Sequence, residues 1–286
     1  NHMGELERLR QELSIIDQGL LEQFLKRMMI VDQVAEHKGK TEGKVFIPEQ
    51  EERVVREAEA NTPPEFRPYA SVFARTLMRL SRERQYERLM DSGLVLVQVL
   101  QHAKEPQGQV RTLALLPGLG RDDTQVVAAL YPEAALVQTD DAGSACRQVA
   151  EGSIDYALLP FTEELVFLLE KHALYVQACL PLNRRYFAVG SKLILPSDVQ
   201  SVRFLIQIKT VETLPLIINI LGDLGLSMVQ VQSLRDSSVC VEFSANPASP
   251  KTHRALYQIQ QEAGAMRLLG CYDDLSSSIN LVNSSG

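Results

Sequence analysis

The chain has 286 residues, of which 45% are hydrophobic and 23% charged, and its formal net charge is −7. This length exceeds what one core usually holds, so we expect two or three domains, and the composition excludes a largely disordered chain. The negative charge argues against a general nucleic-acid binder, although a local basic cleft for a small anion stays open. We expect neither a membrane span nor a signal segment, which favours a cytoplasmic protein.

The first part of the chain, residues 4–104, is predicted to be helical because apolar residues recur in steps of three and four. Pro48 suits the first turn of a helix. Two long helices and a short one leave long apolar faces uncovered, so we expect a homodimer formed through those faces. The predicted helices lie at about residues 6–38, 48–61 and 65–87, the last with a possible extension through 94–100.

After a predicted linker at residues 104–108, apolar strands and helices alternate in the order βαβ, which predicts an α/β lobe over residues 111–195. A joint is expected at residues 196–198. Beyond it the predicted order βαββαβ is that of a ferredoxin-like domain over residues 201–275, and the polar tail 276–286 is expected to be loose. The predicted fold class is therefore multidomain: an all-α helical domain, an α/β lobe and an α+β ferredoxin-like domain.

The four cysteines, Cys146, Cys179, Cys240 and Cys271, are far apart and include no CxxC pair. We predict reduced, mostly buried thiols rather than a disulfide framework or a metal site. The histidines form no group with the spacing of ligands, so no metal and no cofactor are expected.

Three cations lie among apolar neighbours in the first predicted helix: Arg10, Arg27 and Lys38. Arg27 and Lys38 are eleven residues apart, which brings them to within about 20° of one face. Each cation alone could extend to water from the edge of a core. Three together favour an anionic partner, because a buried cation is costly unless something negative meets it. A carboxylate of the next helix or a bound anion could serve.

Polar residues on the other two predicted helices could complete such a site. Glu51 could pair with one of the cations. Ser81 and Gln85 lie one helical turn apart, hence on one face, where both can form hydrogen bonds with the same ligand. Such a pair alone is more often structural.

The pattern of these residues resembles that of the all-helical chorismate mutases. The run LRQELSIID at residues 9–17 is similar to the family's opening LRxxIxxI/LD. The pair Lys26-Arg27 matches its helix-borne arginine, and Lys38 matches its lysine at the helix end.

The second and third helices extend the resemblance. Glu51 falls at the family's substrate-facing glutamate, and Ser81 with Gln85 fits its SxxxQ. The sequence departs from the family's DxxRE at Ile47 and Gln50, which replace the aspartate and the arginine.

The resemblance implies that chorismate is rearranged to prephenate. This reaction needs no proton transfer and no covalent intermediate, so positioning and preorganised donors are sufficient. The resemblance further implies that Arg10 reaches into the site of a second copy, that Lys38 and Gln85 donate to the ether oxygen, and that Glu51 meets the ring hydroxyl. The implied catalytic residues are Arg10, Arg27, Lys38, Glu51 and Gln85, and the implied substrate-binding residues are Ser81 and Gln50.

Residues 111–195 resemble a single lobe of a prephenate dehydratase, on the run 146–160 and on the segment NRRYF at residues 183–187. The latter is similar to that family's NxTRF. The threonine and arginine that carry the dehydratase chemistry are Arg185 and Tyr186 here. We therefore expect no dehydratase activity and, instead, a spacer or dimerisation lobe.

Residues 201–275 resemble an ACT regulatory domain, on residues 225–233 and 269–272. The phenylalanine-binding motifs of that family, GAL and ESRP, are ETL at 212–214 and QSLR at 232–235 here. Binding of an aromatic amino-acid effector and a plain dimerisation role both stay open.

The leading prediction is a homodimeric chorismate mutase with a silent dehydratase-like lobe and an ACT domain for regulation or dimerisation. One alternative is a related mutase or lyase acting on an aminated chorismate or on isochorismate, with Ile47 and Gln50 reading the changed ring substituent. The other is a catalytically silent protein that senses an aromatic amino acid and regulates another enzyme.

Overall fold

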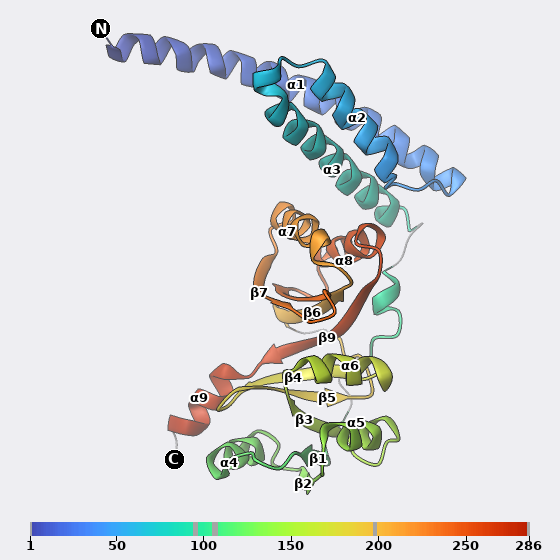
Figure 1. Cartoon of the computed structure of the whole chain (residues 1–286), viewed down its shortest axis with the longest axis vertical. Helices are drawn as coiled ribbons and strands as arrows, with labels where there is room; N and C mark the ends of the chain where they lie inside the picture. The colour runs from blue at the N-terminus through green and yellow to red at the C-terminus, as the bar shows by residue number, and fades with distance from the viewer. Residues whose placement is uncertain (1, 94–96, 105–107, 197–198, 285–286) are drawn as a thin grey trace. The chain divides into compact units, whose positions relative to one another are not determined.

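The computed structural model describes residues 2–93, 97–104, 108–196 and 199–284 (Figure 1). The chain forms two compact units, residues 1–96 and 97–286, which we call the helical unit and the sheet unit. In the described ranges no helix has both the length and the apolar character needed to cross a membrane.

The helical unit is built from long helices connected by short turns. Helix α3 packs against both α1 and α2 (Figure 1). Proline in the first turn favours the starts of α2 and α3. At the end of α1, Glu42 adopts a positive φ of 53° and the Gly43 amide donates to the Lys38 carbonyl at 3.0 Å, which satisfies one of the last carbonyls. The elements are α1 (His2–Thr41), α2 (Pro48–Ala60), a 3₁₀ turn (Pro64–Phe66) and α3 (Arg67–Asp91).

The three helices predicted for this unit are confirmed, and the extension of the third is wrong in its described part. Helix α3 ends at Asp91, and residues Gln98–Leu100 form a separate 3₁₀ helix. Residues 94–96 of that extension, residues 105–107 of the predicted linker and residues 197–198 of the predicted joint lie outside the described residues.

The helical unit has a small core and a large exposed apolar face. Its core cluster consists of Val55, Ala74 and Met78. Along α1, in contrast, large apolar side chains are exposed over more than six helical turns: Leu6, Leu9, Leu13, Ile15, Ile16, Leu20, Leu21, Leu25, Met29 and Ile30. A single copy of the chain therefore leaves the apolar stripe of this helix in water.

The sheet unit is built on one sheet of nine strands among the described residues, in the order β2-β1-β3-β5-β4-β9-β6-β8-β7 (Figure 1). Its first elements are β1 (Thr112–Leu115), α4 (Arg121–Leu130), β2 (Ala135–Gln138), α5 (Ala142–Ala150), β3 (Tyr156–Pro160), α6 (Glu163–Lys171), β4 (Tyr175–Pro181) and β5 (Arg185–Gly190). The remaining elements are β6 (Val202–Ile208), a 3₁₀ turn (Val211–Thr213), α7 (Leu214–Asp223), β7 (Ser227–Ser233), β8 (Val239–Ala245), α8 (Pro250–Glu262), β9 (Met266–Asp274) and α9 (Ser276–Ser284).

The predicted order βαββαβ is confirmed by β6 to β9 with α7 and α8. This half of the sheet joins the other through parallel pairing of β9 with β4. A Cβ atom at Gly270 would lie 2.5 Å from the Val176 carbonyl oxygen, so glycine is what permits this close pairing. The division of the unit into separate domains at residues 111–195 and 201–275 stays a prediction.

The tail contradicts the expectation of a loose segment. Residues Ser276–Ser284 form α9, which packs against α4 and β4. Ile279 is buried in the core cluster that also holds Leu115, Val127 and Leu180. One apolar side chain at the right turn of a polar helix is enough to attach it to the core.

The four cysteines are free thiols and buried. Burial raises the pKa of Cys146, Cys240 and Cys271 to about 12, so these thiols stay protonated and unreactive at neutral pH.

Candidate active site

The helical unit contains a cavity of about 240 Å³ between its helices. Helix α1 contributes Arg27 and Lys38 at positions eleven residues apart, so one helix face carries both cations into the cavity. Helix α2 and the loop before it line a second side, and one face of α3 lines the third. The full lining is Arg27, Val31, Val34, Lys38, Val45, Ile47, Gln50, Glu51, Val54, Met78, Ser81, Arg82 and Gln85.

Arg27 is bonded to neutral oxygens of α3. Its Nη1 donates to the Leu77 carbonyl at 3.3 Å and to the Ser81 hydroxyl, which itself donates to Leu77 O at 2.6 Å. Burial lowers the pKa of Arg27, but a guanidinium is so strong a base that the side chain stays protonated at neutral pH. These contacts fix the guanidinium at the cavity without neutralising its charge.

Lys38 lies at the end of α1, where its Nζ donates to the Val45 carbonyl at 3.3 Å. Burial lowers the pKa of Lys38, and the negative charge of Glu51 acts in the opposite direction. The ammonium group is therefore held by a loop carbonyl near the one carboxylate that lines the cavity.

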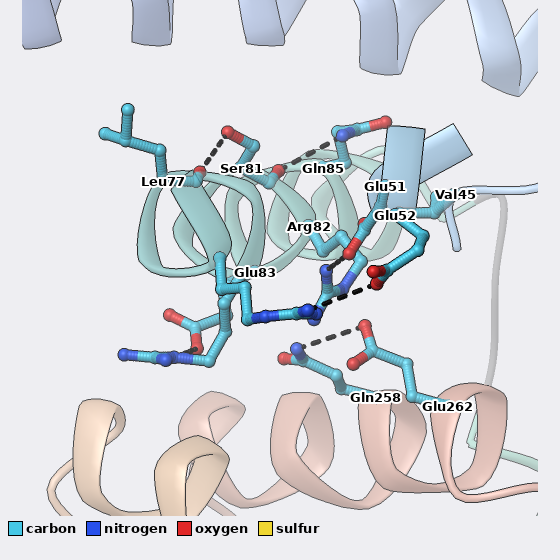
Figure 2. Close-up of polar contacts among 12 residues, drawn as sticks. Val45, Glu51, Glu52, Leu77, Ser81, Arg82, Glu83, Gln85, Gln258 and Glu262 are labelled. Carbon is cyan, nitrogen blue, oxygen red and sulfur yellow. Dashed lines mark hydrogen bonds and ion pairs between the residues drawn. The ribbon is translucent and has the colours of Figure 1, made fainter. Parts of the chain in front are cut away.

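Gln85 is buried on α3, one turn beyond Ser81 (Figure 2). Its Nε2 donates to the Ser81 carbonyl at 3.2 Å. Its Oε1 is buried and has no hydrogen-bond partner among the described residues. A buried acceptor without a partner is costly, so this amide is suited to a ligand or a partner group that donates to it.

Glu51 projects from α2 and forms an ion pair with Arg82 of α3 (Figure 2). The guanidinium carbon of Arg82 also lies 4.8 Å from the centre of the Phe46 ring, a cation–π contact. Arg82 is not among the site residues predicted from the sequence. The signal that could have found it is helical spacing, because Arg82 lies four residues after Met78 and three before Gln85, on the same face of α3.

The structure therefore brings six predicted residues to one cavity: Arg27, Lys38, Gln50, Glu51, Ser81 and Gln85. Ile47, which precedes Pro48 of α2, presents an apolar side chain to it as well. The arrangement combines cations, hydrogen-bond donors and one carboxylate, which suits a small anion that also carries a hydroxyl group. The individual roles of these residues stay predictions.

Arg10 is not brought to this cavity within a single chain. It is exposed on α1, and its distance from Arg27 along the helix is about 25 Å at 1.5 Å per residue. The exposed apolar face of α1 covers the same stretch of helix.

The sheet unit holds a different cluster of charged groups, centred on Arg185 of β5. The Arg185 guanidinium donates to Gln230 Oε1 at 2.9 Å, to Cys179 Sγ at 3.3 Å, to Tyr272 Oη at 3.3 Å and to a carboxylate oxygen of Glu242. Tyr272 donates to the other oxygen of Glu242 at 3.0 Å.

Aromatic rings and burial complete this arginine cluster. The guanidinium carbon of Arg185 lies 4.8 Å from the centre of the Phe187 ring and 5.7 Å from that of Phe161. Glu242 is 3% exposed and Tyr272 1% exposed. Every hydrogen-bonding edge of the guanidinium is thus directed to a group of the protein, across both halves of the sheet.

The two segments at the predicted effector motifs, residues 212–214 and 232–235, are also held by contacts within the sheet unit. Residues Val211–Thr213 form a 3₁₀ turn at the start of α7. The backbone amide of Arg235 donates to Glu163 Oε1 at 2.7 Å, and its guanidinium pairs with the same carboxylate at 3.2 Å. These contacts fix the end of β7 against α6.

In comparison with known proteins, residues 9–86 match the model of the family chorismate mutase type II. Among curated proteins no match is found. Three similar solved structures cover more than half of the chain. One, described as GqqA, a novel type of quorum quenching acylases, is 16% identical with a TM-score of 0.48, over 57% of this chain and 95% of that chain.

The other two are prephenate dehydratases. The enzyme from Streptococcus mutans is 14% identical with a TM-score of 0.46, over 57% of this chain and 97% of that chain. The enzyme from Arthrobacter aurescens in complex with L-Phe is 12% identical with a TM-score of 0.48, over 61% of this chain and 99% of that chain.

Proposed function

We propose that the helical unit, whose residues 9–86 match the chorismate mutase type II family, rearranges chorismate to prephenate. The observation that carries this proposal is the cavity in which two cations of α1 meet the polar face of α3. Arg27 is bonded to neutral oxygens and keeps its charge for a ligand. Chorismate carries two carboxylates, and it is a compact anion with a ring hydroxyl.

The proposed mechanism is electrostatic positioning. Arg27 binds a carboxylate through its guanidinium donors. Ser81 contributes to this binding once its single O–H turns from the Leu77 carbonyl to the ligand. Lys38 and the second N–H of Gln85 Nε2, whose first N–H bonds the Ser81 carbonyl, donate to the ether oxygen, on which negative charge develops as the carbon–oxygen bond breaks. Donors fixed in advance lower the barrier because they need no reorganisation during the reaction. Glu51 accepts from the ring hydroxyl.

The proposed active form is a homodimer. Burial of the apolar stripe of α1 against a second copy would remove the exposed side chains from water, at about 25 cal/mol per Å² of apolar area. Arg10 lies within this stretch of α1 and far from the cavity of its own chain. We propose that it completes the cavity of the second copy, where it binds the other carboxylate. Four free, buried thiols suit the reducing conditions of the cytoplasm, where we place the protein.

For the sheet unit we propose a role without dehydratase chemistry. Arg185 and Tyr186 replace the threonine and arginine of the dehydratase motif. The guanidinium donors of Arg185 are occupied by hydrogen bonds to Glu242, Gln230 and Tyr272. Residues 201–275 then serve as an ACT-like element for dimerisation or for binding an aromatic amino acid.

A second substrate class is favoured by one observation. Ile47 and Gln50, which line the cavity, are apolar and neutral where the family pattern has an aspartate and an arginine. A ring substituent other than the hydroxyl of chorismate, such as the amino group of an aminated chorismate or the shifted hydroxyl of isochorismate, would meet these side chains.

The test is product analysis with the full chain and three substrates: chorismate, aminated chorismate and isochorismate. We expect loss of chorismate with formation of prephenate, and little turnover of the other two. Preferred turnover of either analogue would support the second substrate class. No turnover of any of them by the folded protein would contradict the proposal and favour a silent, ligand-sensing protein.

A further inference from the structure

Of the cations that line the cavity in the described residues, Arg82 is the one without a counterpart in the family pattern. It occupies the first unspecified position of SxxxQ on α3. Its Nη1 donates to Oε2 of Glu51, which comes from α2 and lies 31 residues away in the sequence (Figure 2). Its guanidinium also lies on the Phe46 ring at 4.8 Å. The side chain is therefore oriented by an anion and by a ring from the segment around the start of α2.

The ion pair acts on Glu51 as much as on Arg82. A carboxylate offers about four acceptor positions on its two oxygens, and Arg82 uses one oxygen. The contact fixes the rotamer of Glu51 and leaves acceptor positions for a hydroxyl in the cavity. Without Arg82, the carboxylate would be drawn toward the ammonium of Lys38, whose pKa already responds to it.

The net charge of the cavity lining also indicates a role for Arg82. Its charged lining consists of the cations Arg27, Lys38 and Arg82 and the carboxylate of Glu51, a net charge of +2. Gln50, next to Glu51, contributes none. This net charge is the contribution of one chain, before Arg10 of a second copy is added, and removal of Arg82 would halve it.

We propose that Arg82 is a positioning residue for the mutase reaction. Its guanidinium holds the Glu51 carboxylate in place for the substrate hydroxyl, and it supplies the cavity with a positive charge that Gln50 lacks. This inference rests on the proposed function. The hydroxyl takes no part in the bonds that break and form, so Arg82 acts on ground state and transition state alike. Loss of such an interaction raises KM and leaves kcat nearly unchanged.

The experiment measures kcat and KM for chorismate with the full chain and the variants R82M, E51Q, R82M/E51Q and R82K. We expect R82M to raise KM roughly 10- to 100-fold with kcat within about threefold, and the double variant to be no worse than the poorer single variant, since both act as one unit. R82K should recover part of the loss because it restores the charge but not the planar fork.

The matched control is R75M. Arg75 also lies on α3 and also pairs with a carboxylate of α2, Glu52 at 3.1 Å, but both side chains are about half exposed and neither lines the cavity. The KM and kcat of R75M should stay within about twofold of the wild-type values, because an exposed ion pair outside the cavity contributes little free energy.

Several outcomes would overturn the inference. An unchanged KM in R82M, or effects of R82M and E51Q that add in the double variant, would show that the pair does not act as a unit at the site. A fall in kcat alone, with circular dichroism showing the same folded fraction as the wild type, would show that Arg82 acts in the transition state and would overturn the positioning role. If R82M does not fold, the test uses E51Q and R82K, for which a raised KM with nearly unchanged kcat supports the role of Arg82 and an unchanged KM overturns it. An inactive wild-type protein would overturn the proposed function, whereas an active wild type with unaffected variants would overturn only the role of Arg82.

Discussion

The cations that α1 contributes to the cavity, Arg27 and Lys38, differ from Arg185 of the sheet unit in what they are bonded to. Arg185 of the sheet donates to Glu242, Gln230 and Tyr272, so its charge and its donors are matched inside the protein. Arg27 of the helical unit is bonded to a hydroxyl and a carbonyl, and Lys38 to a carbonyl. A matched cation holds a fold together, whereas a cation that is fixed but not neutralised is prepared for a ligand.

The same comparison applies to the two family resemblances, that of the helical unit to chorismate mutases and that of the sheet unit to prephenate dehydratases. In the helical unit the residues that carry the mutase pattern line a cavity. In the sheet unit the position of the dehydratase threonine holds Arg185, which is part of a buried network. Substitution of Lys38 should therefore affect chemistry, whereas substitution of Arg185 should affect stability.

The largest effect on stability is expected from R185M. This variant leaves the buried carboxylate of Glu242 without its main partner, because Arg203 lies 4.0 Å away and pairs only weakly. Breaking a buried pair costs about 3–5 kcal/mol. For a unit of this size we expect the unfolding temperature of the sheet unit to fall by roughly 10 °C in a thermal scan followed by circular dichroism.

The control for that variant is R235M. Arg235 pairs with Glu163 at 3.2 Å, but its side chain is 94% exposed, so its loss should not change the unfolding temperature measurably. Equal unfolding temperatures for R185M and R235M would show that the network around Arg185 does not stabilise the sheet.

A comparable effect, on catalysis alone, is expected from K38M. Loss of a preorganised donor to the ether oxygen should lower kcat about 10²- to 10³-fold, with a smaller change in KM. The unfolding temperature should stay unchanged, since the Lys38 ammonium has a single hydrogen bond within the described part of the chain, to the loop carbonyl of Val45. Steady-state rates of chorismate loss measure both constants.

Lys40 provides the matched control on the same helix. Its side chain is 72% exposed and pairs with Glu36 one turn earlier, so K40M should retain wild-type kcat. If K38M were as active as K40M, the assignment of Lys38 to the reaction would be wrong.

The smallest effect concerns an ion pair between α1 and α3 outside the cavity. Asp32 accepts from Nε of Arg84 at 2.6 Å and from Nη2 at 2.7 Å. The hydrogen bonds from Arg84 hold the pKa of Asp32 below its usual range. A lowered carboxyl pKa stabilises the fold above the unfolded-state value of about 3.9, and this contribution is lost as the pH falls through the folded-state value.

The variant D32N should therefore be less stable than the wild type at pH 7 by at most about 1 kcal/mol, because both side chains are about one-third exposed and screened by water. The difference should begin to shrink as the pH falls to about 3.9 and should vanish below the lowered folded-state pKa of Asp32, as measured by urea unfolding at a series of pH values. A difference that persists at acid pH would indicate lost packing instead of a lost ion pair.

Local pattern in the sequence was sufficient for much of the fold. The periodicity of three and four predicts α1 to α3, and alternating strands and helices predict β6 to β9. It did not indicate the pairing of β4 with β9, which depends on contact between residues about 90 positions apart such as Val176 and Gly270. The helix α9 was missed because its polar sequence gives no sign that Ile279 is buried.

The candidate site was predictable to a similar extent. Cations spaced along one face of α1, and Ser81 with Gln85 on α3, follow from helical geometry alone. Arg82 lies in the charged run Arg82-Glu83-Arg84, which is typical of a solvated face. Its role depends on Glu51, a residue of another helix, and no local pattern contains that contact.

The most direct test of a cavity completed by a second copy is complementation between two inactive variants, R10A and K38A. Each variant alone should lose chorismate turnover. In a mixed dimer, one cavity receives Lys38 from the R10A chain and Arg10 from the K38A chain, while the other cavity lacks both side chains. After refolding an equimolar mixture, half of the dimers are mixed and carry one intact cavity of two, so we predict about a quarter of the wild-type rate. A mixture as inactive as its components would contradict the shared site.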